Sequence, residues 1–258
     1  MTEQNATTAI PPTLEQFQTQ FPSNLTNIQT IQIEQLWESL HAKNQFPNAQ
    51  TTDDIMNWLE EKRKSYVVNT SIIGINELDR WHVEETTGHV YHESGKFFRI
   101  IGVKVDGAKG REVMGWTQPM VHQQECGILG ILCKKFNGTR HYLLYAKYEP
   151  GNTDVLQLSP TLQATDSNLK MAHGGKKPLF SEYFEGNGKG NVLTNVTSVE
   201  DGGRFYMKTN RNMLVEVDKD EPLDIPDDFI WVNYPQLKEL LAKQVVVNSL
   251  ARSVMGSW

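Results

Sequence analysis

The dipeptide Asn137-Gly138 lies between two runs of residues that favour β-structure, 126–136 and 141–148. Asparagine and glycine are the residues that most readily adopt the positive φ angles of a two-residue hairpin turn. Runs joined by so short a turn pair as antiparallel neighbours, because a parallel crossover needs a dozen residues or more. We therefore expect an antiparallel hairpin at the centre of this chain, with the rest of the fold built around a sheet.

Residues with helical spacing flank this β-rich centre on both sides. We expect helices at 13–17, at 31–43, after a cap at 51–54, at 235–241 and at 245–254. Further strands are expected at 65–68, 97–105, 204–207 and 214–217.

This order of helices, strands and helices, without an internal repeat or a linker, indicates one α+β domain. We expect residues 1–13 to form a flexible tail. Residues 14–258 are expected to form a single domain whose first part, 14–65, is helical.

Charge and apolar runs exclude several classes of protein. The formal net charge is −6 and no Lys/Arg run occurs, so nucleic-acid binding is not expected. No stretch reaches the roughly 18–20 apolar residues of a membrane span. The first residues lack the basic and apolar segments of a secretory signal. Cys126 and Cys133 would face opposite sides of one strand, so we expect two reduced thiols in a cytoplasmic protein.

Polar and apolar residues alternate strictly between residues 156 and 167. The odd positions carry uncharged polar side chains, namely Gln157, Ser159, Thr161, Gln163, Thr165 and Ser167. Such alternation predicts one extended segment with one buried face. Amides and hydroxyls both donate and accept hydrogen bonds, which suits a polyhydroxylated ligand. The residues alone support a binding role and a structural role equally.

Tyr145, Lys147 and Glu149 fall on one face of the second hairpin strand and its continuation. A phenol, a cation and a carboxylate so close together can supply a general base and a stabiliser of developing negative charge. An exposed face with a cross-strand ion pair explains the same residues. The strand alone favours that simpler interpretation.

Single polar residues elsewhere are more often structural than catalytic. This holds for His173, which lies beside two glycines in a loop, and for Arg252, which lies in the expected last helix. The segment 92–98 is expected to be a turn that leads into a core strand.

Several strings, taken together in their order along the chain, resemble the nucleotide-hexose 2,3-dehydratases of deoxysugar biosynthesis. They are HESGKFF, WTQP, QQECGILG, GTRHYLLYAKYEPGN, QLSPTLQATDSN, HGG, EDGGRFY, RNM and NSLARS, and they cover about two-thirds of the chain. AKYEPGN followed closely by QLSPTLQAT is long and unusual in composition, which makes chance a poor explanation.

The resemblance implies a Nudix-like mixed β-sheet core flanked by N-terminal and C-terminal helices. It also implies a lyase that acts on an NDP-4-keto-6-deoxyhexose, usually dTDP-linked, to give a 3,4-diketo-2,6-dideoxy sugar nucleotide. The glutamate-rich Nudix box is absent, so divalent-metal pyrophosphate hydrolysis is not expected. The dehydration itself requires neither a metal nor a redox cofactor, and none is expected. Familiar members carry two tandem copies of this domain and this chain has room for one, so a homodimer is expected.

Catalytic roles follow from the expected chemistry. The C4 ketone acidifies the C3 proton, a base removes that proton, and the C2 hydroxyl leaves with help from an acid. We assign Glu149 as the base and Lys147 as the stabiliser of the oxyanion at O4. His173 or Tyr145 is the candidate proton donor.

The remaining candidates are substrate contacts. Arg252 and Lys96 are candidates for the diphosphate, and Trp81 or Trp116 for stacking on the base. The full set is Trp81, His92, Ser94, Gly95, Lys96, Trp116, Gln118, Asn152, Gln157, Ser159, Thr161, Gln163, Thr165, Ser167, Asn168, Arg204 and Arg252.

Two other functions are weighed against the dehydratase. One is a Nudix-like NDP-sugar pyrophosphohydrolase, against which the missing Nudix box counts. The other is a non-catalytic NDP-sugar-binding protein. Retention of Lys147, Glu149 and His173 argues mildly against it, because a binding protein needs no base.

Overall fold

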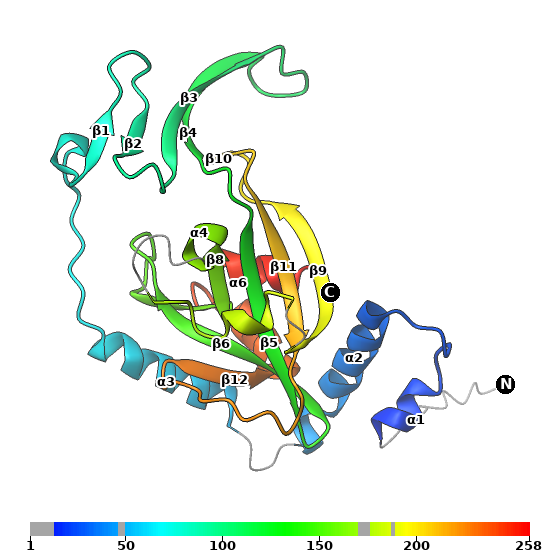
Figure 1. Cartoon of the computed structure of the whole chain (residues 1–258). Coiled ribbons are helices and arrows are strands. Elements are labelled where there is room, and N and C mark those ends of the chain that lie inside the picture. The colour runs from blue at the N-terminus through cyan, green and yellow to red at the C-terminus, as the bar shows by residue number, and fades with distance from the viewer. Residues whose placement is uncertain (1–12, 46–49, 170–175, 187–188) are drawn as a thin grey trace.

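The computed structural model describes residues 13–45, 50–169, 176–186 and 189–258. Helices at both ends of the chain accompany two β-sheets (Figure 1). The helices are α1 (Leu14–Gln18), α2 (Asn27–Gln45), α3 (Thr52–Ser65), α4 (Asp166–Leu169), α5 (Tyr234–Ala242) and α6 (Ser249–Met255), with 3-10 turns at Ile75–Glu77 and Ser181–Tyr183. No helix in these ranges is long and apolar enough to cross a membrane.

The larger sheet has seven strands. They are β5 (Gly127–Phe136), β6 (Thr139–Tyr148), β7 (Leu156–Ser159), β8 (Leu162–Thr165), β9 (Asn191–Val199), β11 (Thr209–Glu216) and β12 (Phe229–Asn233). The path runs β12–β6–β5–β11–β9, while β7 pairs with β6 and β8 pairs with β5. β11 is parallel to β5 and the other pairs are antiparallel. The expected α+β class, with a mixed sheet and helices at both ends, is confirmed.

A smaller sheet of five strands lies beyond one end of the larger sheet (Figure 1). In spatial order they are β1 (Trp81–Val83), β2 (Val90–His92), β3 (Arg99–Asp106), β4 (Gly115–His122) and β10 (Phe205–Tyr206). The short β10 lies in the chain between β9 and β11, and it pairs in parallel with Val121 and His122 of β4. The segment between β9 and β11, two strands of the larger sheet, therefore also supplies a strand to the smaller sheet.

The central hairpin is formed as predicted. Asn137 and Gly138 both have positive φ angles, 50° and 82°, as a two-residue turn of this kind requires. β5 and β6 pair only between this turn and the pair formed by Leu132 and Leu143. Beyond that pair the two strands separate.

β7 and β8 fill the wedge between the separating strands. β7 follows β6 towards the apex, the chain reverses at Pro160 and Thr161, and β8 leaves along β5. The buried Thr161 hydroxyl accepts a hydrogen bond from the Leu132 N–H (2.9 Å) and donates one to the Leu143 carbonyl. One side chain thus pairs the two backbone groups that the separation leaves without a strand partner.

The expectation of one extended segment between residues 156 and 167 is therefore wrong. The segment forms two strands and then turns into α4. Alternation survives the reversal because each strand buries one face against its own partner. Period-two spacing cannot distinguish one long strand from two short strands in succession.

Other boundaries were also only partly predicted. The start of α3 is confirmed: Thr51 Oγ1 accepts the Asp54 N–H (3.1 Å), and the Asp54 carboxylate accepts the Thr51 N–H (2.8 Å). The strand expected at 65–68 is absent, since α3 continues to Ser65 and residues 66–68 pair with no strand. The last helix begins four residues later than predicted, capped by Asn248. β1, β2, β4, β9 and β12 were not predicted.

Opposite faces of the larger sheet are covered differently. Ile131 and Leu144 point to the face that packs against α3, α5 and α6. Their neighbours Leu132 and Leu143 point to the other face, which packs against Phe184 and nearby aromatic residues. The period-two alternation of the hairpin strands thus supplies two separate cores.

α2 is attached to the sheet by buried charges. Glu34 pairs with Arg140 (2.7 Å) and with Lys135 (2.8 Å), and Arg140 also contacts Glu216. Glu38 accepts the Arg140 N–H (3.2 Å) through Oε1, while its buried Oε2 has no hydrogen-bond partner within the described ranges. Burial raises the pKa of Glu38 from 4.5 to about 7, and the Arg140 N–H opposes this shift.

Thr161→Val tests the apex of the wedge. The replacement keeps the shape of the side chain but leaves the Leu132 N–H and the Leu143 carbonyl unpaired. We expect the free energy of unfolding, measured in urea, to fall by about 1–3 kcal/mol. Thr197→Val, on an exposed part of β9, is the matched control and should change it by less than about 0.5 kcal/mol. An equal loss in both variants would contradict the bridging role.

Glu38→Gln tests the buried carboxyl. Between pH 4.5 and about 7 the folded protein holds a proton that the unfolded chain has lost, so Glu38 lowers the free energy of unfolding as pH rises. We expect Glu38→Gln to remove this dependence of the free energy of unfolding on pH. Between pH 4.5 and 8 the variant should gain at most about 3 kcal/mol of unfolding free energy relative to the wild type. Urea unfolding at several pH values measures it, with Glu61→Gln on the exposed face of α3 as control. A constant difference across that range would refute the prediction.

Candidate active site

A cavity of about 460 Å³ opens where the larger sheet meets the smaller one. We call it the central cavity. β6 contributes Lys147 and, just beyond its end, Glu149; β8 contributes Gln163 and Thr165; Asn168 follows in α4. Five of the residues predicted from the sequence therefore line one cavity, although they come from three elements.

Lys147 is the centre of this group. Its ammonium lies 2.7 Å from Oε1 of Glu149 and donates to Oε1 of Gln163 at 2.8 Å. The Asn152 amide donates to the Lys147 carbonyl (3.3 Å) and to the Val155 carbonyl (3.4 Å), which fixes the turn after Glu149. A carboxylate held beside an ammonium, both partly exposed, can accept a proton while the cation stabilises a nearby oxyanion.

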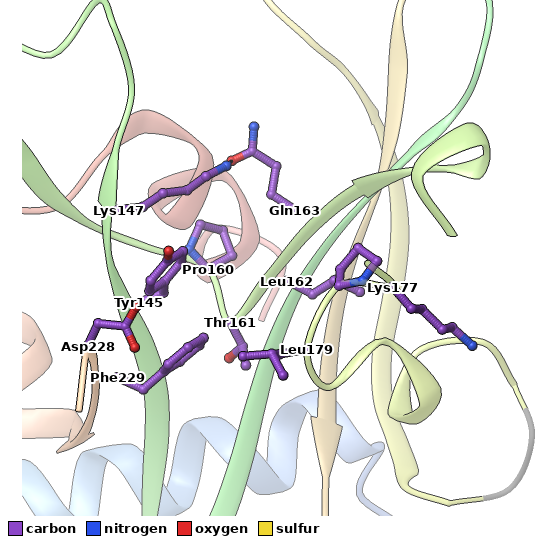
Figure 2. Close-up of a pocket in the computed structure, with 11 residues that line it drawn as sticks. Tyr145, Lys147, Pro160, Thr161, Leu162, Gln163, Lys177, Leu179, Asp228 and Phe229 are labelled. Carbon is purple, nitrogen blue, oxygen red and sulfur yellow. Dashed lines mark hydrogen bonds between the residues drawn. The ribbon is translucent and has the colours of Figure 1, made fainter. Parts of the chain in front are cut away.

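A second cavity, of about 340 Å³, shares lining residues with the first. Figure 2 shows the residues that line this second cavity. Lys147 and Gln163 line both cavities, so their contact separates one from the other. Tyr145 lines the second cavity and stacks on Phe229, with ring centroids 4.6 Å apart. Burial, with a contribution from Asp228, raises the pKa of Tyr145. Its phenol is therefore neutral at physiological pH but lies on the other side of the Lys147–Gln163 contact.

A third cavity, of about 380 Å³, is lined by Lys96, Arg99 and His122 together with Gly95, and Glu125 adds one carboxylate to its lining. Gln123 lines both this cavity and the central one. Two cations against one carboxylate leave an excess of positive charge around this opening, which favours an anionic ligand. We call it the cationic cavity.

An aromatic cluster lies beside these two cavities. Trp81 packs against Phe98, with ring centroids 5.1 Å apart, and Phe98 lines the central cavity. His92 packs edge-on against Trp81, and its Nδ1 lies 2.8 Å from Oγ of Ser94. Trp81 therefore contacts a residue of the central cavity but does not line the cavity itself.

Several of the alternating polar residues form hydrogen bonds within the fold and so have a structural role. Ser159 is buried and accepts a hydrogen bond from Asn248 (2.8 Å), and Thr161 lies at the apex of the wedge. The Gln157 amide donates to the Val245 carbonyl (3.1 Å). Ser167 donates to the Glu125 carboxylate (2.8 Å). Within that alternating set, Gln163 and Thr165 are the members that line the central cavity.

Another group of candidates joins β4 to the loop before β10. The Trp116 indole donates to Gln118 (2.8 Å), and the Gln118 amide donates to the Gly203 carbonyl (2.9 Å). Arg204 donates to the same carbonyl (3.2 Å). None of Trp116, Gln118 and Arg204 lines the three cavities described above.

Arg252 and His173 complete the predicted set. The Arg252 guanidinium donates to the Val247 carbonyl (3.1 Å) and to the Leu241 carbonyl (2.8 Å), so it joins the end of α5 to α6. His173 lies outside the described residues.

The sequence profile of a family described as NDP-hexose 2,3-dehydratase matches residues 52–257. The chain belongs to this family. The resemblance inferred from the motifs is thereby confirmed, and the match begins at the first residue of α3, leaving α1 and α2 outside it.

Two curated relatives are named dTDP-4-dehydro-6-deoxy-alpha-D-glucopyranose 2,3-dehydratase. The one from Amycolatopsis orientalis is 43% identical over 212 residues, which are 80% of this chain and 44% of the relative. The one from Saccharopolyspora spinosa is 42% identical over 199 residues, 77% of this chain and 40% of the relative. The chain thus spans less than half the length of these relatives.

Solved structures with a similar arrangement include a Nudix hydrolase from M. smegmatis, RenU. It is 16% identical, with a TM-score of 0.33, over 60% of this chain and 96% of that one. The Ap4A hydrolase of C. elegans is 12% identical, with a TM-score of 0.34, over 52% of this chain and 96% of that one.

Sequence reasoning missed one side of the central cavity. Glu200, Lys208 and Asn210 line it, and they lie in or beside β9 and β11. Glu200 begins the string EDGGRFY, but the candidate singled out from that string was Arg204. Within the described residues, no three His, Cys, Asp or Glu side chains form a group that could hold a metal ion.

Proposed function

We propose that this protein removes water from an NDP-4-keto-6-deoxyhexose and gives a 3,4-diketo-2,6-dideoxy sugar nucleotide. The observation that carries the proposal is the contact of Lys147 with both Glu149 and Gln163 at the wall of the central cavity. Family membership supports the reaction class. The names of the relatives support a dTDP-linked sugar as the substrate.

In the proposed reaction Glu149 removes the C3 proton, which the C4 ketone makes acidic. The negative charge that develops at O4 lies near the Lys147 ammonium, whose own position is fixed by Gln163. The C2 hydroxyl then leaves as water and the enol product tautomerises. The ketone stabilises the charge, so this sequence of steps needs neither a metal nor a redox cofactor.

The sugar nucleotide extends from the central cavity into the cationic cavity in this proposal. Lys96 is the predicted diphosphate ligand, and it lines that cavity with Arg99 and His122. Gln123 lines both cavities, which supports one continuous binding path. Trp81 and Phe98 offer aromatic faces beside this path for the base.

We also propose that two copies associate as a homodimer in the cytoplasm. One chain spans 44% and 40% of the two relatives, so two copies would supply a comparable number of residues. The free thiols Cys126 and Cys133 agree with a reducing compartment. Light scattering after gel filtration measures the mass, and the mass of one chain would contradict the dimer.

The reaction is tested by incubating the protein with several NDP-4-keto-6-deoxyhexoses, the dTDP-linked glucose derivative among them. We expect loss of the mass of one water molecule. Release of a sugar phosphate on addition of magnesium would instead identify a pyrophosphohydrolase, and binding without any conversion would identify a sugar-nucleotide-binding protein.

Glu149→Gln tests the base. It should reduce both water loss and deuterium exchange at C3 by about 100-fold or more, because general base catalysis contributes roughly 10²–10⁴-fold. Mass spectrometry of substrate recovered from deuterium oxide measures the exchange, with Glu61→Gln as the control at an exposed site. Exchange at the wild-type rate in Glu149→Gln would remove Glu149 from this role.

A further inference from the structure

The floor of the central cavity is one face of the larger sheet. Gln163 lies opposite Leu129, and Thr165 lies opposite Gly127. Gly127 is in turn paired with Asn210 of β11. Side chains of directly paired residues lie on the same face, so these five residues belong to one surface.

The far side of this floor carries a second carboxylate. Asn210 pairs with Ser198 of β9, and Glu200 follows two residues later on the same face. The Asn210 amide donates to Oε2 of Glu200 at 2.9 Å. Glu200 is half-buried and lines the cavity, so its carboxyl group is held in place but accessible.

The sheet makes room for this amide at one position. A Cβ atom at Gly127 would lie 2.3 Å from Oδ1 of Asn210, closer than real Cβ atoms come to another atom. Asn210 is only 5% exposed, so its side chain has little space to move away. The glycine and the asparagine together fix the direction in which Glu200 is held.

Glu149 and Glu200 lie on opposite sides of the floor. Three strand spacings of about 4.8 Å separate the row of Gln163 from the row of Glu200, which is about 14 Å between backbones. Side chains that reach inward from both rows leave room for one sugar ring. A base and an acid placed on either side of such a ring suit the removal of a proton from one carbon and a hydroxyl from the next.

We propose that Glu200 donates the proton to the departing C2 hydroxyl, and that Asn210 is a positioning residue for Glu200. The inference rests on the proposed dehydration. Glu149 takes the C3 proton, and the electrons of that bond form the C3–C4 double bond of the enolate, whose charge lies on O4. The enolate then reforms the C4 ketone, its electrons form the C2–C3 double bond, and the C2–O bond breaks. The hydroxyl leaves with the Glu200 proton as water. The two carboxyl groups have then exchanged protonation states, and solvent restores them.

Tyr145 is less suited to this step. It lines the second cavity, and the Lys147–Gln163 contact lies between it and the central cavity. Glu200 has no such barrier, because it lines the same cavity as Glu149.

Glu200→Gln separates the two steps of the reaction. We expect water loss to fall by about 100-fold or more, while deuterium enters C3 of the recovered substrate at no less than the wild-type rate. Glu149→Gln should lose both signals. If Glu200→Gln proves unfolded by circular dichroism, Glu200→Asp takes its place. That variant keeps the acid but shortens its reach, and slower water loss with continued exchange is expected.

Asn210→Ala tests the positioning role. We expect a lower kcat for water loss with KM nearly unchanged and with exchange retained, whereas a merely structural defect would lower exchange and water loss together. Wild-type water loss in Glu200→Gln, or loss of exchange equal to that of Glu149→Gln, would overturn the assignment of Glu200. If the wild-type protein dehydrates no NDP-4-keto-6-deoxyhexose, the proposed function itself fails.

Discussion

The hydroxyl of Thr161 occupies the point where two antiparallel strands stop pairing. Separation of β5 and β6 would leave backbone groups without partners in the core, which costs free energy. β7 and β8 pair with most of these groups, and the Thr161 hydroxyl takes the two at the apex because it both donates and accepts. The candidate site depends on this wedge, since Lys147 leaves one arm and Gln163 the other, and they meet across it.

Local chemistry explains which parts of the fold could be predicted. The Asn137-Gly138 turn and the Thr51 cap follow from φ preferences and from short-range hydrogen bonds, which a sequence states directly. The reversal at Pro160 could not be predicted in this way, because the polar and apolar residues on either side of it keep the spacing of a straight strand. Residues 65–68 have β-forming side chains but no strand beside them, and only the tertiary structure reveals that.

The candidate site likewise contains residues that the sequence predicts and residues that only the tertiary structure brings together. Lys147 lies in β6 and Glu149 lies just beyond its end, two positions later, so their closeness could be predicted from the sequence. Glu200 is brought to the same cavity by the pairing of β9, β11 and β5, for which no short-range pattern exists. Arg252 shows the opposite case, because a cation that suits a phosphate instead holds two backbone carbonyls.

The ion pair between Glu34 of α2 and Arg140 of the sheet also affects where the chain could be truncated. The family match begins at residue 52, but the carboxylate 2.7 Å from the buried Arg140 belongs to Glu34, upstream of that boundary. A chain cut at residue 52 would keep every strand yet leave Arg140 with Glu216 as its remaining acidic neighbour among the described pairs. Losing one partner of a buried pair costs about 3–5 kcal/mol, a large part of the stability of an ordinary domain. Residues upstream of the family match thus contribute to the stability of the sheet that lies within it.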